Sequence, residues 1–212
     1  PVRQGSGDFG AKYPIDNTRP TIPRILKSVN PKYVAAHFGK WDHRTDLAPE
    51  HLCYDASDGN VGNQPGSITS GFYNKEKWHK YTVTEDPKRI FSLTDRSIDF
   101  MMRSVRDDRP FYLQISHWAV HVTMQTRRCS LEKYEQLPKG EKHNVPAFGG
   151  MTEDLDFGIG KILDKIDELG IAEEPLETAG AAALHRFRIG ADDRVAICEI
   201  PCEEALGVED RL

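Results

Sequence analysis

Six consecutive residues combine two basic side chains, an imidazole and a carboxylate. They read Gly39-Lys40-Trp41-Asp42-His43-Arg44. The stretch directly follows an apolar run, residues 33–38, whose composition predicts a buried strand. Lys and Arg on a loop that leaves such a strand could grip an anionic group. The alternative is a solvated loop that carries an ordinary surface lysine.

A second group of polar residues follows another predicted strand. Arg109-Pro110 ends a helical pattern, and apolar and polar residues then alternate from Phe111 to Ser116, as in a strand. This strand delivers residues 116–121, which include His117 and His121, to its C-terminal end. We expect His117, like His37 in the first strand, to be a structural histidine with satisfied hydrogen bonds.

Helical patterns alternate with these strands. A short helix is predicted over residues 22–29, and Ser92 with an acid three residues later predicts the start of another helix. The apolar stripe from Met151 to Leu169 predicts a third helix, which Gly170 ends. The polar stretch from residue 39 to about residue 86 is long for a loop and is expected to be functional. This alternation favours an α/β fold with helices on both faces of a sheet and ligands beyond the carboxyl ends of the strands.

Composition limits the possible partners. The chain has 212 residues, 38% of them hydrophobic, which is enough for one sizeable domain. The formal net charge is -5, so we expect no general attraction to nucleic acid or to an anionic membrane. Any anion that binds must therefore be held by a local site.

No apolar run is long enough to span a bilayer. The four cysteines lack the spacing of a zinc knuckle or of a redox pair.

Four segments resemble, in the same order along the chain, signature segments of the type I (formylglycine-dependent) sulfatases of the alkaline-phosphatase-like superfamily. The first resembles Tyr-x-Thr-x-x-x-Gly-Lys-Trp-His, and the third resembles a strand that leads to a His. Together they span about Thr21 to Ile171, most of the chain. The segments are Tyr33 with Gly39-Lys40-Trp41, then His51 to Asp55, then Arg109 to Leu113 with Trp118 to His121, and finally Met151 to Asp156 with Gly158, Gly160 and Leu169-Gly170.

The resemblance implies a fold and a division of the chain. The fold would be an α/β, alkaline-phosphatase-like α/β/α sandwich with a mixed central sheet, incomplete in this chain. Residues 1–20 would be a polar lead-in and residues 21–171 a partial sulfatase catalytic domain. Residues 172–212 would be a divergent tail, because no strand of the family pattern follows the last helix. A frameshift in the coding sequence is one hypothesis for this tail, and a genuine divergent segment is the other.

The resemblance also implies roles for individual residues. Lys40 and His121 would contact the sulfate group or the leaving oxygen of a sulfate ester. Such an ester stays negatively charged, and its hydrolysis puts further charge on the departing alkoxide. The fixed charge of a lysine and a proton from a histidine would lower the activation barrier of this hydrolysis. The family's second His is replaced by Asp42, so His43 is the candidate for that role, and a rewired site is the alternative.

Some family features are missing from the sequence. The Cys/Ser-x-Pro/Ala-x-Arg motif that yields formylglycine does not occur, and the family's Ca²⁺ ligands, an early Asp-Asp pair expected before residue 1 and a later Asp-Asn pair, are not found. No metal ligand is therefore assigned. We expect an inactive piece of a sulfuric ester hydrolase that acts on a small-molecule or carbohydrate sulfate ester. A phosphodiesterase or phosphatase relative and a non-catalytic anion-binding remnant are the alternatives. Members of the family are often exported, periplasmic or lysosomal, and the compartment of this protein stays open.

Overall fold

The computed structural model describes residues 18, 20–41, 47–66, 81–142, 144–172, 188–189 and 195–199, the last two ranges by their backbone. The helices are α2 (Ile22–Val29), α3 (Ile90–Arg106), α4 (Arg128–Gln136) and α5 (Pro146–Glu168). The strands are β1 (Val34–Gly39), β2 (Ala56–Ser57), β3 (Tyr81–Val83), β4 (Phe111–Ser116), β5 (Met124–Thr126), β6 (Arg188–Ile189) and β7 (Val195–Glu199). Three 3₁₀ turns lie between them: η1 (Pro49–Leu52), η2 (Gln64–Gly66) and η3 (Pro87–Arg89).

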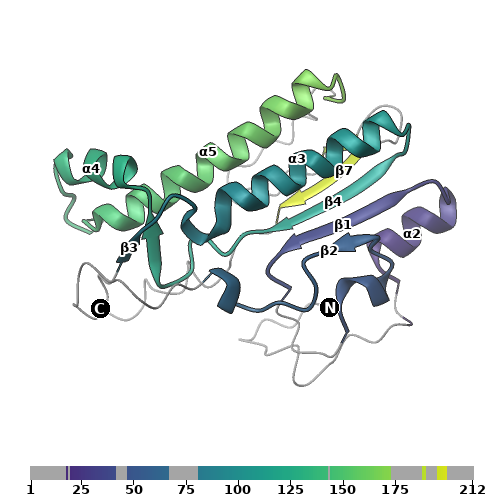
Figure 1. Ribbon diagram of the computed structural model, residues 1–212, viewed down its shortest axis with the longest axis horizontal. Coiled ribbons are helices and arrows are strands. Elements are labelled where there is room, and N and C mark those ends of the chain that lie inside the picture. The colour runs from purple at the N-terminus through teal and green to yellow at the C-terminus, as the bar shows by residue number, and fades with distance from the viewer. Residues whose placement is uncertain are drawn as a thin grey trace.

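The described strands form a five-stranded sheet in the order β2-β1-β4-β7-β6, and β3 pairs with β5 separately. The first four strands of the larger sheet are parallel, and β6 is antiparallel to β7. Val34 lies opposite Phe111, and the register continues until Gly39 lies opposite Ser116. The carboxyl ends of β1 and β4 therefore meet at one edge of the sheet, as Figure 1 shows. The expected α/β class is confirmed.

Both faces of the sheet are covered. On one face Phe38 and Leu113 pack with Phe100 of α3 and Ile162 of α5, and Figure 1 shows both helices on that side. On the other face, a cluster around Tyr112 includes residues of β1 and η1 and reaches α2. Because both faces are buried, all residues of β4 but the last are buried although their sequence alternates.

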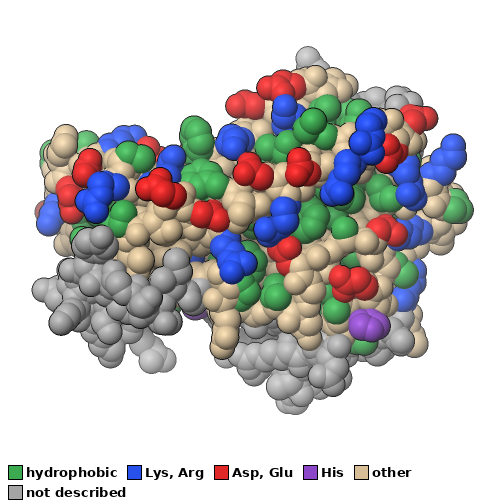
Figure 2. All heavy atoms as spheres, viewed as in Figure 1, with side chains coloured by type: hydrophobic (Ala, Val, Ile, Leu, Met, Phe, Trp, Pro, Cys, Tyr) green, Lys and Arg blue, Asp and Glu red, His purple; other side chains and the backbone are tan. Residues whose placement is uncertain are grey.

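The surface of α3 and α5 mixes charges. Figure 2 shows basic and acidic side chains interspersed over these helices, with apolar side chains between them. One pair joins the two helices, since the ammonium of Lys161 lies 3.3 Å from a carboxylate oxygen of Asp95. None of the described helices is both long and apolar enough to cross a membrane.

The helix predicted to start after Ser92 begins at Ile90 instead. The side chain of Asp86 accepts hydrogen bonds from the backbone N–H of Phe91 at 2.9 Å and of Ser92 at 3.3 Å. An earlier carboxylate thus satisfies the free N–H groups of the first turn, which leaves no capping role for the hydroxyl of Ser92. The prediction was wrong because the acid that caps this helix lies outside the local motif.

The last predicted helix is longer than its apolar stripe. α5 begins at Pro146 rather than at Met151, because proline suits the first position of a helix. A Cβ on Gly150 would lie 2.3 Å from the hydroxyl oxygen of Thr126, so this glycine lets α5 approach β5 closely. The helix ends as predicted, with Gly170 at a φ of +65°.

A genuine divergent segment predicts a helix or a strand in the C-terminal stretch, without a choice between them. Residues 195–199 form β7, which pairs in parallel with β4 from Phe111 to Ile115. The sheet therefore continues beyond β4 with residues that the family resemblance assigned to a divergent tail. The predicted polar lead-in lies outside the described residues, apart from Thr18 and Pro20.

Candidate functional site

The turn that ends β1 fixes the backbone at Lys40. The N–H of Lys40 donates to the carbonyl oxygen of Ser116 at 2.8 Å, and the preceding Gly39 has a φ of +98°. A Cβ on Gly39 would lie 2.0 Å from the same carbonyl oxygen. Only glycine accepts both this backbone conformation and this close approach. The glycine thus brings the half-buried Lys40 directly beside the end of β4.

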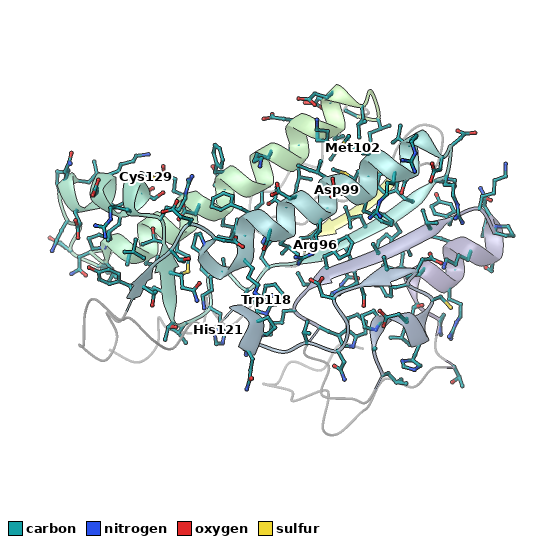
Figure 3. The ribbon with its side chains drawn as sticks, in the orientation of Figure 1. Arg96, Asp99, Met102, Trp118, His121 and Cys129 are labelled. Atoms are coloured by element: carbon teal, nitrogen blue, oxygen red, sulfur yellow. The ribbon has the colours of Figure 1, made fainter. Side chains whose placement is uncertain are left out.

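An ion pair supports the same turn from α3. The N–H of Gly39 donates to Asp58 Oδ2 at 2.8 Å, and Arg96 donates to the same oxygen at 2.9 Å. Figure 3 shows Arg96 on the side of α3 that faces the sheet. Asp58 and Arg96 therefore act as positioning residues for the Gly39 turn. Sequence reasoning missed them because they are far apart in the chain and belong to no local motif.

The end of β4 leads into a turn that carries His121. The N–H of His121 donates to the carbonyl oxygen of Trp118 at 3.0 Å. Trp118 is only 2% exposed, and its indole N–H donates to the carbonyl oxygen of Gly62 at 2.8 Å. Figure 3 shows Trp118 and His121 together beyond the sheet. A buried indole thus anchors the turn, while the imidazole of His121 stays partly exposed.

The structure links two of the three predicted site residues to one edge of the sheet. Lys40 is hydrogen-bonded to the last residue of β4, and the turn with His121 starts from that same strand end. The third residue, His43, lies outside the described residues. Its role therefore stays a prediction.

One ring nitrogen of His37 has a hydrogen-bond partner, as predicted for a structural histidine, whereas the buried Nδ1 has no hydrogen bond among the described residues. The side chain is 1% exposed, and Nε2 lies 3.1 Å from the hydroxyl oxygen of Ser116. The imidazole also makes edge-to-face contacts with Trp41 and Tyr54, at centroid distances of 4.8 and 5.8 Å. The packed rings of His37, Trp41 and Tyr54 stabilise the end of β1 next to the Gly39 turn.

His117 does not fit the role predicted for it. It is 9% exposed, and neither ring nitrogen has a hydrogen-bond partner among the described residues. Burial lowers the pKa of the imidazole from 6.5 to about 4, so the ring is neutral at pH 7. The prediction of a satisfied histidine was wrong, because the sequence does not show which polar groups reach a buried ring.

The pKa of His117 predicts how stability depends on pH. The unfolded chain takes up a proton on this imidazole below pH 6.5, whereas the folded protein does so only near pH 4. The free energy of unfolding should therefore fall as the pH drops through this window, by about 3 kcal/mol from this group at its lower end. Urea unfolding followed by tryptophan fluorescence at several pH values measures the slope. His117→Phe should flatten it, and an unchanged slope in that variant would contradict the assignment.

The calcium that the family resemblance implies finds no ligand set in this part of the chain. Among the described residues, no three His, Cys, Asp or Glu side chains are grouped so that they could hold a metal ion. Ca²⁺ requires several oxygen ligands around one point. The described residues therefore do not fit this ion, and no chemical step is assigned to it here.

Comparisons with known proteins identify the fold. The sequence matches no protein-family model and no curated protein. The structure is similar to the crystal structure of Ps i-CgsB, an iota-carrageenan sulfatase, with a TM-score of 0.53 and 18% identity over 74% of this chain. A structure of Ps i-CgsB in complex with k-i-k-neocarrahexaose has a TM-score of 0.48 and 18% identity over 69% of this chain. The matched region spans 38% and 36% of those two chains. The first of these similarities shows that the chain has a sulfatase-like α/β fold.

Proposed function

We propose that this chain carries part of the substrate-binding site of a sulfatase and that Lys40 and His121 contact a sulfate ester. The observation that supports this most is the hydrogen bond from the N–H of Lys40 to the carbonyl oxygen of Ser116. It joins the end of β1 to the strand end from which the His121 turn departs. Parallel α/β sheets bind their ligands at this edge.

The two side chains would have different tasks. The ammonium of Lys40 would stabilise the negative sulfate oxygens, and His121 would hold a proton near the leaving oxygen. His43 is proposed as a further contact of the same group. The likeness in fold to a carrageenan sulfatase favours a sulfated carbohydrate over other sulfate esters as the ligand class.

Catalysis is proposed for the intact parent protein rather than for this polypeptide. The printed sequence has no Cys/Ser-x-Pro/Ala-x-Arg motif, so it offers no precursor of the formylglycine nucleophile. We expect the 212-residue chain to bind sulfate and to leave 4-nitrocatechol sulfate intact. Release of 4-nitrocatechol above the buffer rate, lost in Lys40→Ala, would contradict the inactivity and assign the chain a different nucleophile.

Lys40→Ala tests the binding site. We expect sulfate to bind at least about tenfold more weakly to this variant, because a hydrogen bond to a charged group contributes about 1.5–3 kcal/mol. Sodium sulfate is titrated against sodium chloride at equal ionic strength while the fluorescence of the tryptophans is recorded. Lys139→Ala, which removes an exposed lysine, is the matched control and should bind like the wild type.

Two outcomes count against the proposal. Equal sulfate affinity in Lys40→Ala and in the wild type removes Lys40 from the site. If phosphate binds through Lys40 much more tightly than sulfate does, the phosphodiesterase or phosphatase alternative is favoured instead. The same titration, with inorganic phosphate as the second probe, gives both answers.

A further inference from the structure

An unpartnered imidazole is buried at the carboxyl end of β4. His117 is 9% exposed, and both of its ring nitrogens lack a hydrogen-bond partner among the described residues. A polar group that is buried without a partner loses the hydrogen bonds that water gave it, at a cost in stability. Buried polar groups are usually satisfied, so a group that is not satisfied calls for a functional explanation.

In the chain, His117 lies between the two residues that bond the backbone of the proposed sulfate contacts. Ser116, directly before it, accepts the hydrogen bond from Lys40. Trp118, directly after it, is fixed by its indole N–H and accepts the hydrogen bond from His121. The unsatisfied ring therefore belongs to the strand end that joins Lys40 to His121.

The state of the ring matches one class of ligand. A neutral imidazole has one N–H donor and one acceptor nitrogen, and burial keeps His117 neutral at pH 7 by lowering its pKa. Sulfate oxygens only accept hydrogen bonds, so the N–H is the group that they would engage. A donor that is already desolvated and held rigidly needs little reorganisation to bind.

We propose that His117 is a third binding residue of the sulfate-ester site and donates its N–H to an oxygen of the ligand. This inference rests on the proposed function, because it takes the same ligand at the same edge of the sheet. The buried imidazole of His117 destabilises the free protein, and a hydrogen bond to the ligand would offset that loss in the complex. A residue retained only for packing would have no such bond.

The proposal separates stability from affinity, and two substitutions measure both. His117→Phe fills the space without polar atoms, so the free energy of unfolding at pH 7 should be maintained or raised. Sulfate should bind about tenfold more weakly, as expected for the loss of one hydrogen bond to a charged group. His117→Asn keeps a donor and should fall between the phenylalanine variant and the wild type. Urea unfolding and the sulfate titration are performed on the full chain.

Thr82→Val is the matched control. Thr82 is also buried, and its hydroxyl oxygen also lacks a hydrogen-bond partner among the described residues, but it lies in β3, in the other sheet. This substitution should maintain or raise stability and leave sulfate affinity unchanged. A loss of affinity in Thr82→Val equal to that in His117→Phe would mean that the effect is not local and would overturn the proposal.

The remaining outcomes distinguish this inference from the proposed function. If His117→Phe binds sulfate like the wild type while Lys40→Ala does not, His117 is not a ligand contact and the proposed function stands. If the wild type shows no sulfate-specific binding, both fall. If His117→Phe does not unfold cooperatively, His117→Asn replaces it in the titration. The inference is overturned if this variant binds sulfate like the wild type and if, in the wild type, sulfate leaves the ring ¹⁵N signals of His117 unshifted.

Discussion

Gly39→Ala should lower the free energy of unfolding by about 3 kcal/mol or more and abolish sulfate binding. Gly39 has a φ of +98°, a conformation that alanine rarely adopts. The new Cβ would also lie 2.0 Å from the carbonyl oxygen of Ser116, which belongs to the neighbouring strand. Relief of this clash requires β1 to separate from β4 where Lys40 is placed. Urea unfolding and the sulfate titration measure the two effects.

Gly59→Ala is the control for backbone conformation alone. Gly59 has a φ of +83°, and a Cβ there would meet nothing within 4 Å. This variant should lose only about 1–2 kcal/mol, the cost of the left-handed conformation. If Gly39→Ala costs no more than Gly59→Ala, the close approach to Ser116 is not what requires glycine at the end of β1.

Asp154→Ala should destabilise the protein by about 3–5 kcal/mol, because it leaves buried donors unpaired. Asp154 lies on α5, is 0% exposed, and joins this helix to β5 and to the start of α4. Its carboxylate accepts hydrogen bonds from the N–H of Arg127 at 2.9 Å, Arg127 Nε at 2.7 Å, Ser130 Oγ at 2.6 Å and Thr126 Oγ1 at 3.4 Å. The guanidinium of Arg127 also lies 4.6 Å from the ring centroid of Phe91 in α3. Arg127 therefore links Asp154 of α5 to α3, and the loss of Asp154 would disturb this link. Thermal and urea unfolding measure the loss.

The adjacent residue provides the control for Asp154. Glu153 forms an ion pair with Lys133 at 2.8 Å, and the side chain of Lys133 is 59% exposed. Exposed pairs contribute less than about 1 kcal/mol, so Glu153→Ala should change stability little. Similar losses in the two variants would show that the buried network around Asp154 does not hold α5 in place.

Much of the fold was predictable because its signals are local. The apolar run before Gly39 and the alternating residues after Pro110 gave two strands, and Gly170 gave the end of α5. The choice of Lys40 and His121 at these strand ends came from the family resemblance. In a parallel sheet the carboxyl ends share an edge, so the location of both residues at one edge followed from element type and chain order.

The features that the sequence did not predict correctly depend on interaction partners that lie far away in the chain or outside the local motif. The local motif predicts Ser92 as a helix cap, but Asp86 accepts the hydrogen bonds of that turn. The sequence did not locate β7, because its pairing partner β4 lies more than eighty residues earlier in the chain. The role of Asp58 depends likewise on Gly39 and Arg96.

By itself the sequence determined the α/β class, the main strands and helices, and the residue types at the two strand ends. Hydrophobic periodicity, proline, glycine and charge influence structure within a few residues, so they can be read directly from the sequence. Only the tertiary structure decided that Gly39 must be glycine, that Asp154 is fully buried, and that His117 is buried with no partner among the described residues. Burial and hydrogen-bond satisfaction depend on which distant segments come together, and local spacing does not specify that.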